Sequence, residues 1–92
     1  MKNEKLYTVR FTAQSLKHLK KITNEDVDTI LNWINKNLID TTNPRFLGKA
    51  LSGHYSNYWR YRVGKYRIIA DIKDQEIVIE VIAIGHRKNI YR

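Results

Sequence analysis

The 92-residue chain contains no cysteine, a single proline and only four glycines. The absence of cysteine excludes disulfide bonds, thiolate metal sites and thiol nucleophiles. No apolar run is long enough to span a bilayer, and the N-terminus has no apolar segment typical of a signal peptide. We therefore expect a single domain over residues 1–92, in a reducing compartment such as the cytoplasm and without membrane contact.

Acidic residues are scarce in the second half of the chain. Seventeen Lys and Arg outnumber nine Asp and Glu, which gives a formal net charge of +8. No acid occurs between Asp40 and Asp71, or after Glu80. The first of these windows contains the cations Arg45, Lys49, Arg60, Arg62, Lys65 and Arg67. Such an excess in a small domain indicates a polyanionic partner, of which nucleic acid is the first candidate and an acidic protein the alternative.

Hydrophobic periodicity predicts the element order βααβββ. Residues 6–11 alternate as a strand, Thr12 is a candidate N-cap for a first helix, and Asn24 is one for a second. Residues 46–58 are expected to form a loop, with room for a short strand, before strands at about 57–63, 66–72 and 76–84. The apolar stripe of the second helix consists of Val27, Ile30, Leu31, Ile34 and Leu38. We predict an α+β fold, an antiparallel sheet of about four strands with both N-terminal helices packed on one face.

Three arginines are predicted to share one face of this sheet. Gly-Lys at residues 64–65 fits a two-residue type II′ turn, which pairs Arg62 directly with Arg67. Arg60 then emerges on the same face, away from the helices. Solvated surface arginines are one explanation. Phosphate binding accounts better for the choice of arginine, because guanidinium groups make bidentate contacts and stay charged at any working pH.

The histidines and the C-terminal segment supply further candidates. His86 follows the last strand beside the basic group, and histidine is the residue type best suited to carry protons near neutral pH. Two roles are open for Tyr91: its ring could stack on an RNA base, or it could pack onto the sheet as a structural aromatic residue. His18, among lysines of the first helix, is expected to be a solvated surface residue.

Three segments resemble the RelE branch of the RelE/ParE toxin superfamily: KALSG (49–53), YWRYRVGKYRII (58–69) and VIAIGHRKNIYR (81–92). The resemblance extends from Tyr7 to Arg92. It implies a compact sheet with two helices on one face, and a toxin that enters the ribosomal A site and cleaves mRNA there. It also implies a cognate antitoxin that covers the basic face, with the free toxin monomeric and the complex a hetero-oligomer.

The resemblance also implies the site. The residues that it places at the family's functional positions are Arg60, Arg62, Arg67, Arg87 and Tyr91. His86 occupies the position next to Arg87. In the best-studied branch the positions of Arg60 and Arg62 are lysines, one of which acts in proton transfer, a role that arginine does not readily fill.

The expected reaction is metal-independent and needs no cofactor, because the RNA 2′-OH is itself the nucleophile. It would yield a 2′,3′-cyclic phosphate and a 5′-OH end. The four arginines would hold the phosphate, and His86 is the candidate proton carrier. Contacts to the RNA backbone are expected from Arg45, Lys49, Lys65 and Lys88. The alternatives are a ParE-like gyrase poison and a non-catalytic ribosome- or RNA-binding relative.

Overall fold

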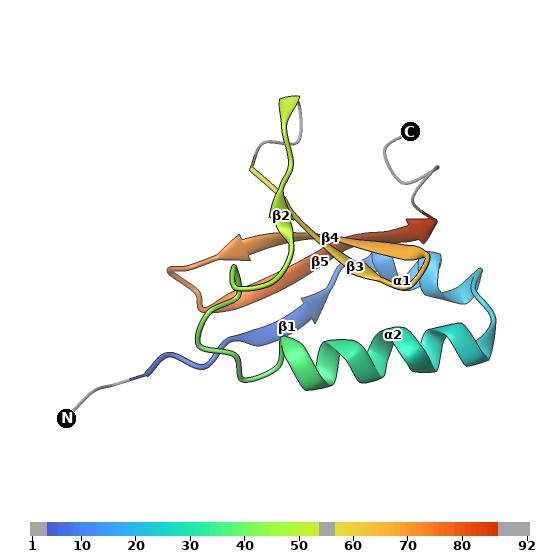
Figure 1. Cartoon of the computed structure of the whole chain (residues 1–92), viewed down its shortest axis with the longest axis horizontal. Helices are drawn as coiled ribbons and strands as arrows, with labels where there is room; N and C mark the ends of the chain where they lie inside the picture. The colour runs from blue at the N-terminus through green and yellow to red at the C-terminus, as the bar shows by residue number, and fades with distance from the viewer. Residues whose placement is uncertain (1–3, 54–56, 87–92) are drawn as a thin grey trace.

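The structure, a computed structural model, describes residues 4–53 and 57–86. The elements in chain order are β1 (Thr8–Phe11), α1 (Ala13–Lys20), α2 (Asn24–Asn37), β2 (Lys49–Ala50), β3 (Trp59–Val63), β4 (Tyr66–Lys73) and β5 (Val78–His86). The strands form one five-stranded sheet in the order β1-β5-β4-β3-β2. Both helices lie on the same side of this sheet (Figure 1), so the predicted α+β class and its single helical layer are confirmed.

Two details of the sheet go beyond the prediction of about four antiparallel strands. The short segment β2 adds a fifth strand, paired antiparallel with β3. The first strand, β1, runs parallel to β5, with Thr8 opposite Val78 and Phe11 opposite Val81. The period-2 pattern of a strand reports which face is buried and says nothing about the direction of its neighbour. Parallel neighbours require a long connection, which the whole chain between β1 and β5 provides here.

A threonine caps the N-terminus of each helix. The Thr12 side chain accepts a hydrogen bond from the Ser15 amide (3.1 Å), as predicted for the first helix. The predicted cap of the second helix is wrong by one residue, because Thr23 precedes α2 and accepts from the Asp26 amide (3.2 Å). Asn24 is the first helical residue. Both hydroxyls satisfy an amide that has no partner within the helix.

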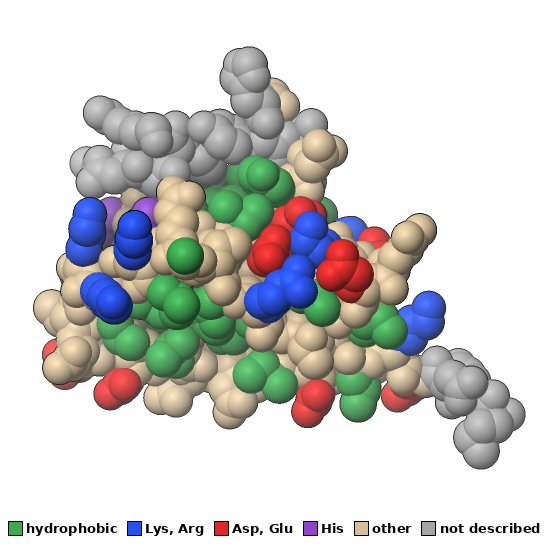
Figure 2. All heavy atoms as spheres, turned by 180° about the vertical axis from the view of Figure 1, so that it is seen from behind, with side chains coloured by type: hydrophobic (Ala, Val, Ile, Leu, Met, Phe, Trp, Pro, Cys, Tyr) green, Lys and Arg blue, Asp and Glu red, His purple; other side chains and the backbone are tan. Residues whose placement is uncertain are grey.

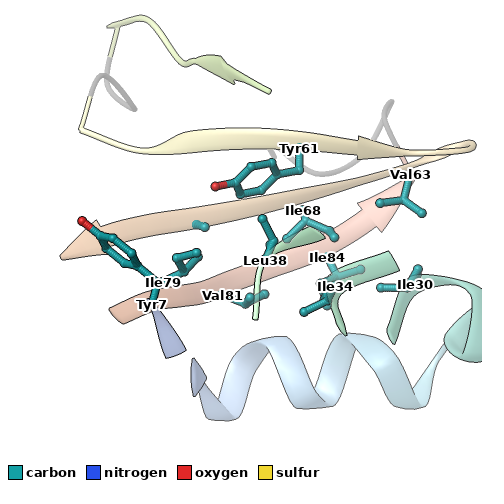
Figure 3. Close-up of a cluster of buried hydrophobic side chains, with 11 residues drawn as sticks. Tyr7, Ile30, Ile34, Leu38, Tyr61, Val63, Ile68, Ile79, Val81 and Ile84 are labelled. Atoms are coloured by element: carbon teal, nitrogen blue, oxygen red, sulfur yellow. The ribbon is translucent and has the colours of Figure 1, made fainter. Parts of the chain in front are cut away.

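The core lies between the helices and the sheet (Figure 3). Helix α2 buries Ile30 and Ile34 against it, and its C-cap residue Leu38 is buried as well, whereas Leu31, expected in the same stripe, is 38% exposed. The β3–β4 hairpin contributes its inward face, centred on Tyr61, which is fully buried. The Tyr61 hydroxyl donates a hydrogen bond to the Pro44 carbonyl, and burial raises the pKa of this phenol.

Helix α1 covers the edge of β5 beyond the end of β1. The Thr12 amide donates to the Val81 carbonyl (3.0 Å), and the Ile84 amide donates to Nδ1 of His18 (3.1 Å). These contacts satisfy backbone groups that no strand reaches. The expectation that His18 is merely solvated is therefore wrong: its ring is half-buried and replaces a missing neighbour strand.

The β4–β5 turn is tied to two distant segments through Asp74. Its carboxylate accepts a hydrogen bond from the Tyr7 hydroxyl (2.7 Å) and two from the Arg45 guanidinium (3.0 Å each). The Arg45 guanidinium, and secondarily the Tyr7 hydroxyl, hold the pKa of Asp74 below its ordinary value. The cluster connects residues that precede β1, the loop after α2 and the β4–β5 turn.

The Asp74 cluster gives a prediction about acid stability. A carboxyl whose pKa is lowered by folding stabilises the folded state above its unfolded pKa, near 3.8, and this contribution disappears as pH falls through the folded pKa. We expect Asp74→Asn to lower the free energy of unfolding by about 1 kcal/mol at pH 7, a value limited by solvent screening. Urea titrations of both proteins should converge as pH falls below the folded pKa of Asp74; a gap of equal size at pH 7 and at this acidic limit would contradict this role of the charge.

Candidate nucleic-acid interface

The β3–β4 hairpin has the predicted register. Val63 lies opposite Tyr66, and Arg62 lies directly opposite Arg67. Gly64 has a φ of +59°, and Lys65 has no positive φ, as the first and second loop positions of a type II′ turn require. Directly opposed residues lie about 5 Å apart on one face. The two guanidinium-bearing side chains therefore leave the sheet together, on the side without helices.

The helix-free face carries charge at both ends. The β4 side chains on this face are those of Arg67, Ile69, Asp71 and Lys73. The apolar Ile69 among them is buried, with 4% of its surface exposed. Asp71 lies opposite Glu80, and acidic and basic side chains are intermixed on the side of the molecule seen in Figure 2.

The acidic end of this face is neutralised locally. Lys73 contacts Asp71 (3.2 Å) and Glu80 (3.8 Å), and Arg10 contacts Glu80 (3.0 Å) and Glu76 (3.5 Å). Asp71 is four residues along β4 from Arg67, about 13 Å, which exceeds the Debye length of about 8 Å at physiological salt. The acids therefore offset the charge of Arg67 little, whereas Arg60, opposite Ile69, lies nearer to them.

The arginine end has no acidic counterpart within the described residues. No carboxylate of the described residues lies within 4.0 Å of the side-chain nitrogens of Arg60, Arg62 or Arg67. The Nε atom of Arg67 is buried and has no hydrogen-bond partner in the described part of the chain. A buried N–H without an acceptor costs about 1–3 kcal/mol, and more when the group is charged.

The cations predicted to contact RNA backbone are in different environments. Arg45 is held by Asp74 in the bidentate pair described above. Lys65 lies 3.8 Å from Asp26 and over the ring of Tyr66. Lys49 is exposed and lies opposite Arg60 across the β2–β3 pair, so it is the one that extends the arginine group.

His86 does not share the arginine face. Its partner across the β4–β5 pair is Tyr66, whose hydroxyl donates to Asp26 of α2, and the two rings are 5.6 Å apart. His86 instead lines a hollow of about 310 Å³ with His18 of α1. Simple alternation of β5 would have placed it beside Arg67.

A β-bulge explains this placement. Ile69 pairs with Ala83 and Ala70 pairs with Val81, so Ile82 is an extra residue on β5. One extra residue reverses the faces of all that follow it in the strand. We expected His86 beside the arginines, but its side chain lies on the opposite, helical face of the sheet. The other tail candidates, Arg87, Lys88 and Tyr91, lie outside the described residues.

A tight backbone contact positions β2 next to Arg60, and the sequence patterns did not identify it. Gly48 has a φ of +85°, and a Cβ there would lie against the Arg60 carbonyl oxygen and 2.7 Å from Nε1 of Trp59. The Trp59 indole N–H donates to the Leu47 carbonyl (2.7 Å). Glycine at residue 48 thus allows the chain to cross closely over β3.

A hollow borders the arginine group at the β3 edge. It has a volume of about 490 Å³ and is lined by Trp33 and Asn37 of α2, by Gly48 and Lys49, and by Arg60 and Arg62. It exists because β2 pairs only with the first two residues of β3. Sequence reasoning assigned Trp33 and Asn37 no role in a site.

Within residues 4–53 and 57–86, no three side chains of His, Asp and Glu gather in a metal-binding arrangement. Neither described helix has the length and hydropathy needed to cross a membrane.

Comparison with known proteins establishes the family. Residues 9–91 match the family model described as ParE toxin of type II toxin-antitoxin system, parDE. Toxin RelG of Mycobacterium tuberculosis is 28% identical over 86 residues, which cover 94% of this chain and 97% of RelG. The chain therefore belongs to the ParE toxin family of type II toxin–antitoxin systems, within the RelE/ParE superfamily that the sequence motifs indicated.

Solved structures share the fold. The crystal structure of the RelBE2 toxin–antitoxin complex from M. tuberculosis includes a chain with a TM-score of 0.80, 22% identity and coverage of 97% of this chain and 100% of that one. The isolated E. coli RelE toxin has a TM-score of 0.69 and 21% identity, over 87% of this chain and 83% of that one. At these identities the structures establish the architecture alone.

Proposed function

We propose that this toxin is a metal-independent endoribonuclease that cleaves mRNA in the ribosomal A site. The observation that supports this most directly is the arginine end of the helix-free face, where Arg62 and Arg67 are directly opposed without a described carboxylate nearby. Like charges opposite one another destabilise a strand pair by up to about 1 kcal/mol. An anionic substrate bound between them would remove that penalty.

The reaction needs little from the protein beyond positioning and charge. The RNA 2′-oxygen attacks the adjacent phosphorus, the 5′-oxygen leaves, and the products are a 2′,3′-cyclic phosphate and a 5′-OH end. In this proposal Arg62 and Arg67, which are directly opposed, bind the non-bridging oxygens as negative charge develops on them. Arg60 and Lys49 bind the neighbouring phosphate. Arg87 and Tyr91 keep the roles that the family resemblance implies.

The position of His86 gives a prediction about proton transfer. Because its ring packs against Tyr66 on the helical side of the sheet, we expect His86→Ala to retain cleavage within about threefold of the wild type. A general acid or base typically contributes 10²–10⁴-fold, so the two outcomes are well separated. The measurement is the rate of cleavage of a translated message by primer extension. A loss of 100-fold or more would show that His86 reaches the reacting atoms.

A second function is favoured by the family model itself, which is described as a ParE toxin. A gyrase poison would bind a protein target and cleave no RNA. Expression of the toxin distinguishes the two: breaks within codons of translated messages support the nuclease, whereas DNA damage with trapped gyrase and intact messages supports the poison. Binding to ribosomes without new RNA ends would indicate a non-catalytic relative.

We also propose an antitoxin as the protein partner, on the basis of the toxin–antitoxin complex formed by the structurally similar chain from M. tuberculosis. An acidic antitoxin segment over the arginine end would neutralise the same charges that bind RNA. Co-expression of the neighbouring gene should then both abolish growth inhibition and block binding of RNA in vitro. Rescue of growth by a partner that leaves RNA binding intact would place the antitoxin elsewhere.

A further inference from the structure

We infer that the hollow at the β3 edge is a nucleobase pocket, which holds an unpaired RNA base next to the phosphate bound by the arginines. This inference rests on the proposed function and adds a specificity site to it. The pocket combines an indole ring (Trp33), a carboxamide (Asn37) and three cations (Lys49, Arg60 and Arg62). Its volume of about 490 Å³ lies in the usual range for small-ligand sites, roughly 300–1,000 Å³.

The aromatic side chain is fixed in place and still accessible. One side of Trp33 packs against Tyr61, with ring centroids 5.6 Å apart and planes inclined by 54°. The remainder of the half-buried indole lines the hollow. Because Tyr61 is itself fully buried, the indole is held by the core and cannot turn away freely. A rigid aromatic plane beside cations is the arrangement on which proteins stack splayed, single-stranded bases.

Asn37 supplies groups that can read a base edge. Its Nδ2 donates one hydrogen bond to the Trp33 carbonyl (3.0 Å), which fixes the orientation of the amide. The other Nδ2 hydrogen and the Oδ1 acceptor make no hydrogen bond with the described residues. An amide with both a donor and an acceptor available can bind a base edge in bidentate geometry. The pocket is thus able to prefer one base over another.

The cations connect this pocket to the proposed cleavage site. Arg62 lines the hollow and also lies directly opposite Arg67, so one residue borders both. A chain whose phosphate lies between these two arginines would bring an adjacent base to the β3 edge. An acidic peptide could use the same cations, but it would leave the indole plane and the amide without a partner of matching shape. The combination therefore favours RNA.

The test uses uncleavable RNA, so that binding is measured apart from catalysis. The full chain is titrated with 2′-O-methyl hexanucleotides that carry each of the four bases in turn at one position, and fluorescence anisotropy gives the Kd values. We expect wild-type affinities to differ by about 10-fold between the best and worst base, the size of discrimination that one bidentate contact to a base edge provides. Trp33→Leu should remove most of that difference, and Asn37→Ala should change which base is preferred.

Asn35→Ala is the matched control, because Asn35 is exposed on the same helix and does not line the hollow. It should leave base preference unchanged, and Asn37→Ala keeps the test valid if Trp33→Leu unfolds the protein. Base preferences that are equal in all these variants would overturn the inference. The inference would also be overturned if Trp33→Leu or Asn37→Ala lost binding to a Glu-rich peptide without any change in RNA binding. That result would identify the hollow as a protein-binding site. A wild-type toxin that cleaves nothing but shows this base preference would contradict the proposed function and leave the pocket supported.

Discussion

Arg67→Met is expected to abolish growth inhibition while leaving the fold as stable as the wild type, or more so. The buried Nε of Arg67 has no partner in the described residues, so the folded protein pays to keep it there. Methionine retains the aliphatic stem and removes that cost. Loss of one donor aimed at developing negative charge typically lowers turnover by about 10²–10³-fold. Cleavage of a translated message and urea unfolding of the same preparation measure the two effects.

Arg10→Met is the matched control for this prediction. It removes the same charge from the same helix-free face, but Arg10 lies in the ion-paired cluster with Glu76 and Glu80. We expect it to leave cleavage nearly unchanged, whereas Arg67→Lys should retain a part of it, because lysine keeps the charge and loses the bidentate geometry. If Arg10→Met and Arg67→Met reduce cleavage equally, the effect is one of net charge and the site is placed wrongly.

The contrast between these two arginines shows what local sequence determines. The β3–β4 register depends on Gly64 and on alternation within ten residues, so it could be predicted residue by residue. The shared face of Arg62 and Arg67 follows directly from that register. The α2 stripe was predictable for the same reason, except for Leu31, which stays 38% exposed.

The features that sequence reasoning missed depend on contacts between distant segments. The bulge at Ile82 lies within the apolar run of residues 81–84, in which no polar residue marks the change of face. For that reason simple alternation predicts the wrong side for His86. The roles of His18 and Arg45 arise from partners 66 and 29 residues away, which no spacing rule reveals. The hollow beside Trp33 exists only because β2 is two residues long.

Gly48→Ala is expected to be the most destabilising of the substitutions considered, lowering the free energy of unfolding by about 3 kcal/mol. The positive φ of +85° costs an L-residue about 1–2 kcal/mol. The new methyl group would also meet the backbone of β3 at the Arg60 carbonyl, and overpacking of this kind costs about 1–3 kcal/mol. A reduced entropy of the unfolded chain offsets about 0.4–1 kcal/mol of this. Urea unfolding at pH 7 gives the value directly.

Gly53→Ala separates the two causes, because Gly53 has a similar φ of +66° but no atom of the described residues within 4 Å of an added Cβ. It should cost only the backbone strain, about 1 kcal/mol after the entropic offset. The difference of about 2 kcal/mol then measures the close crossing of the chain over β3. That crossing also holds Lys49 opposite Arg60, so Gly48→Ala should weaken RNA binding in the protein that remains folded, and Gly53→Ala should not. Equal losses of stability in both variants would mean that the crossing segment moves aside freely and does not build the edge of the pocket.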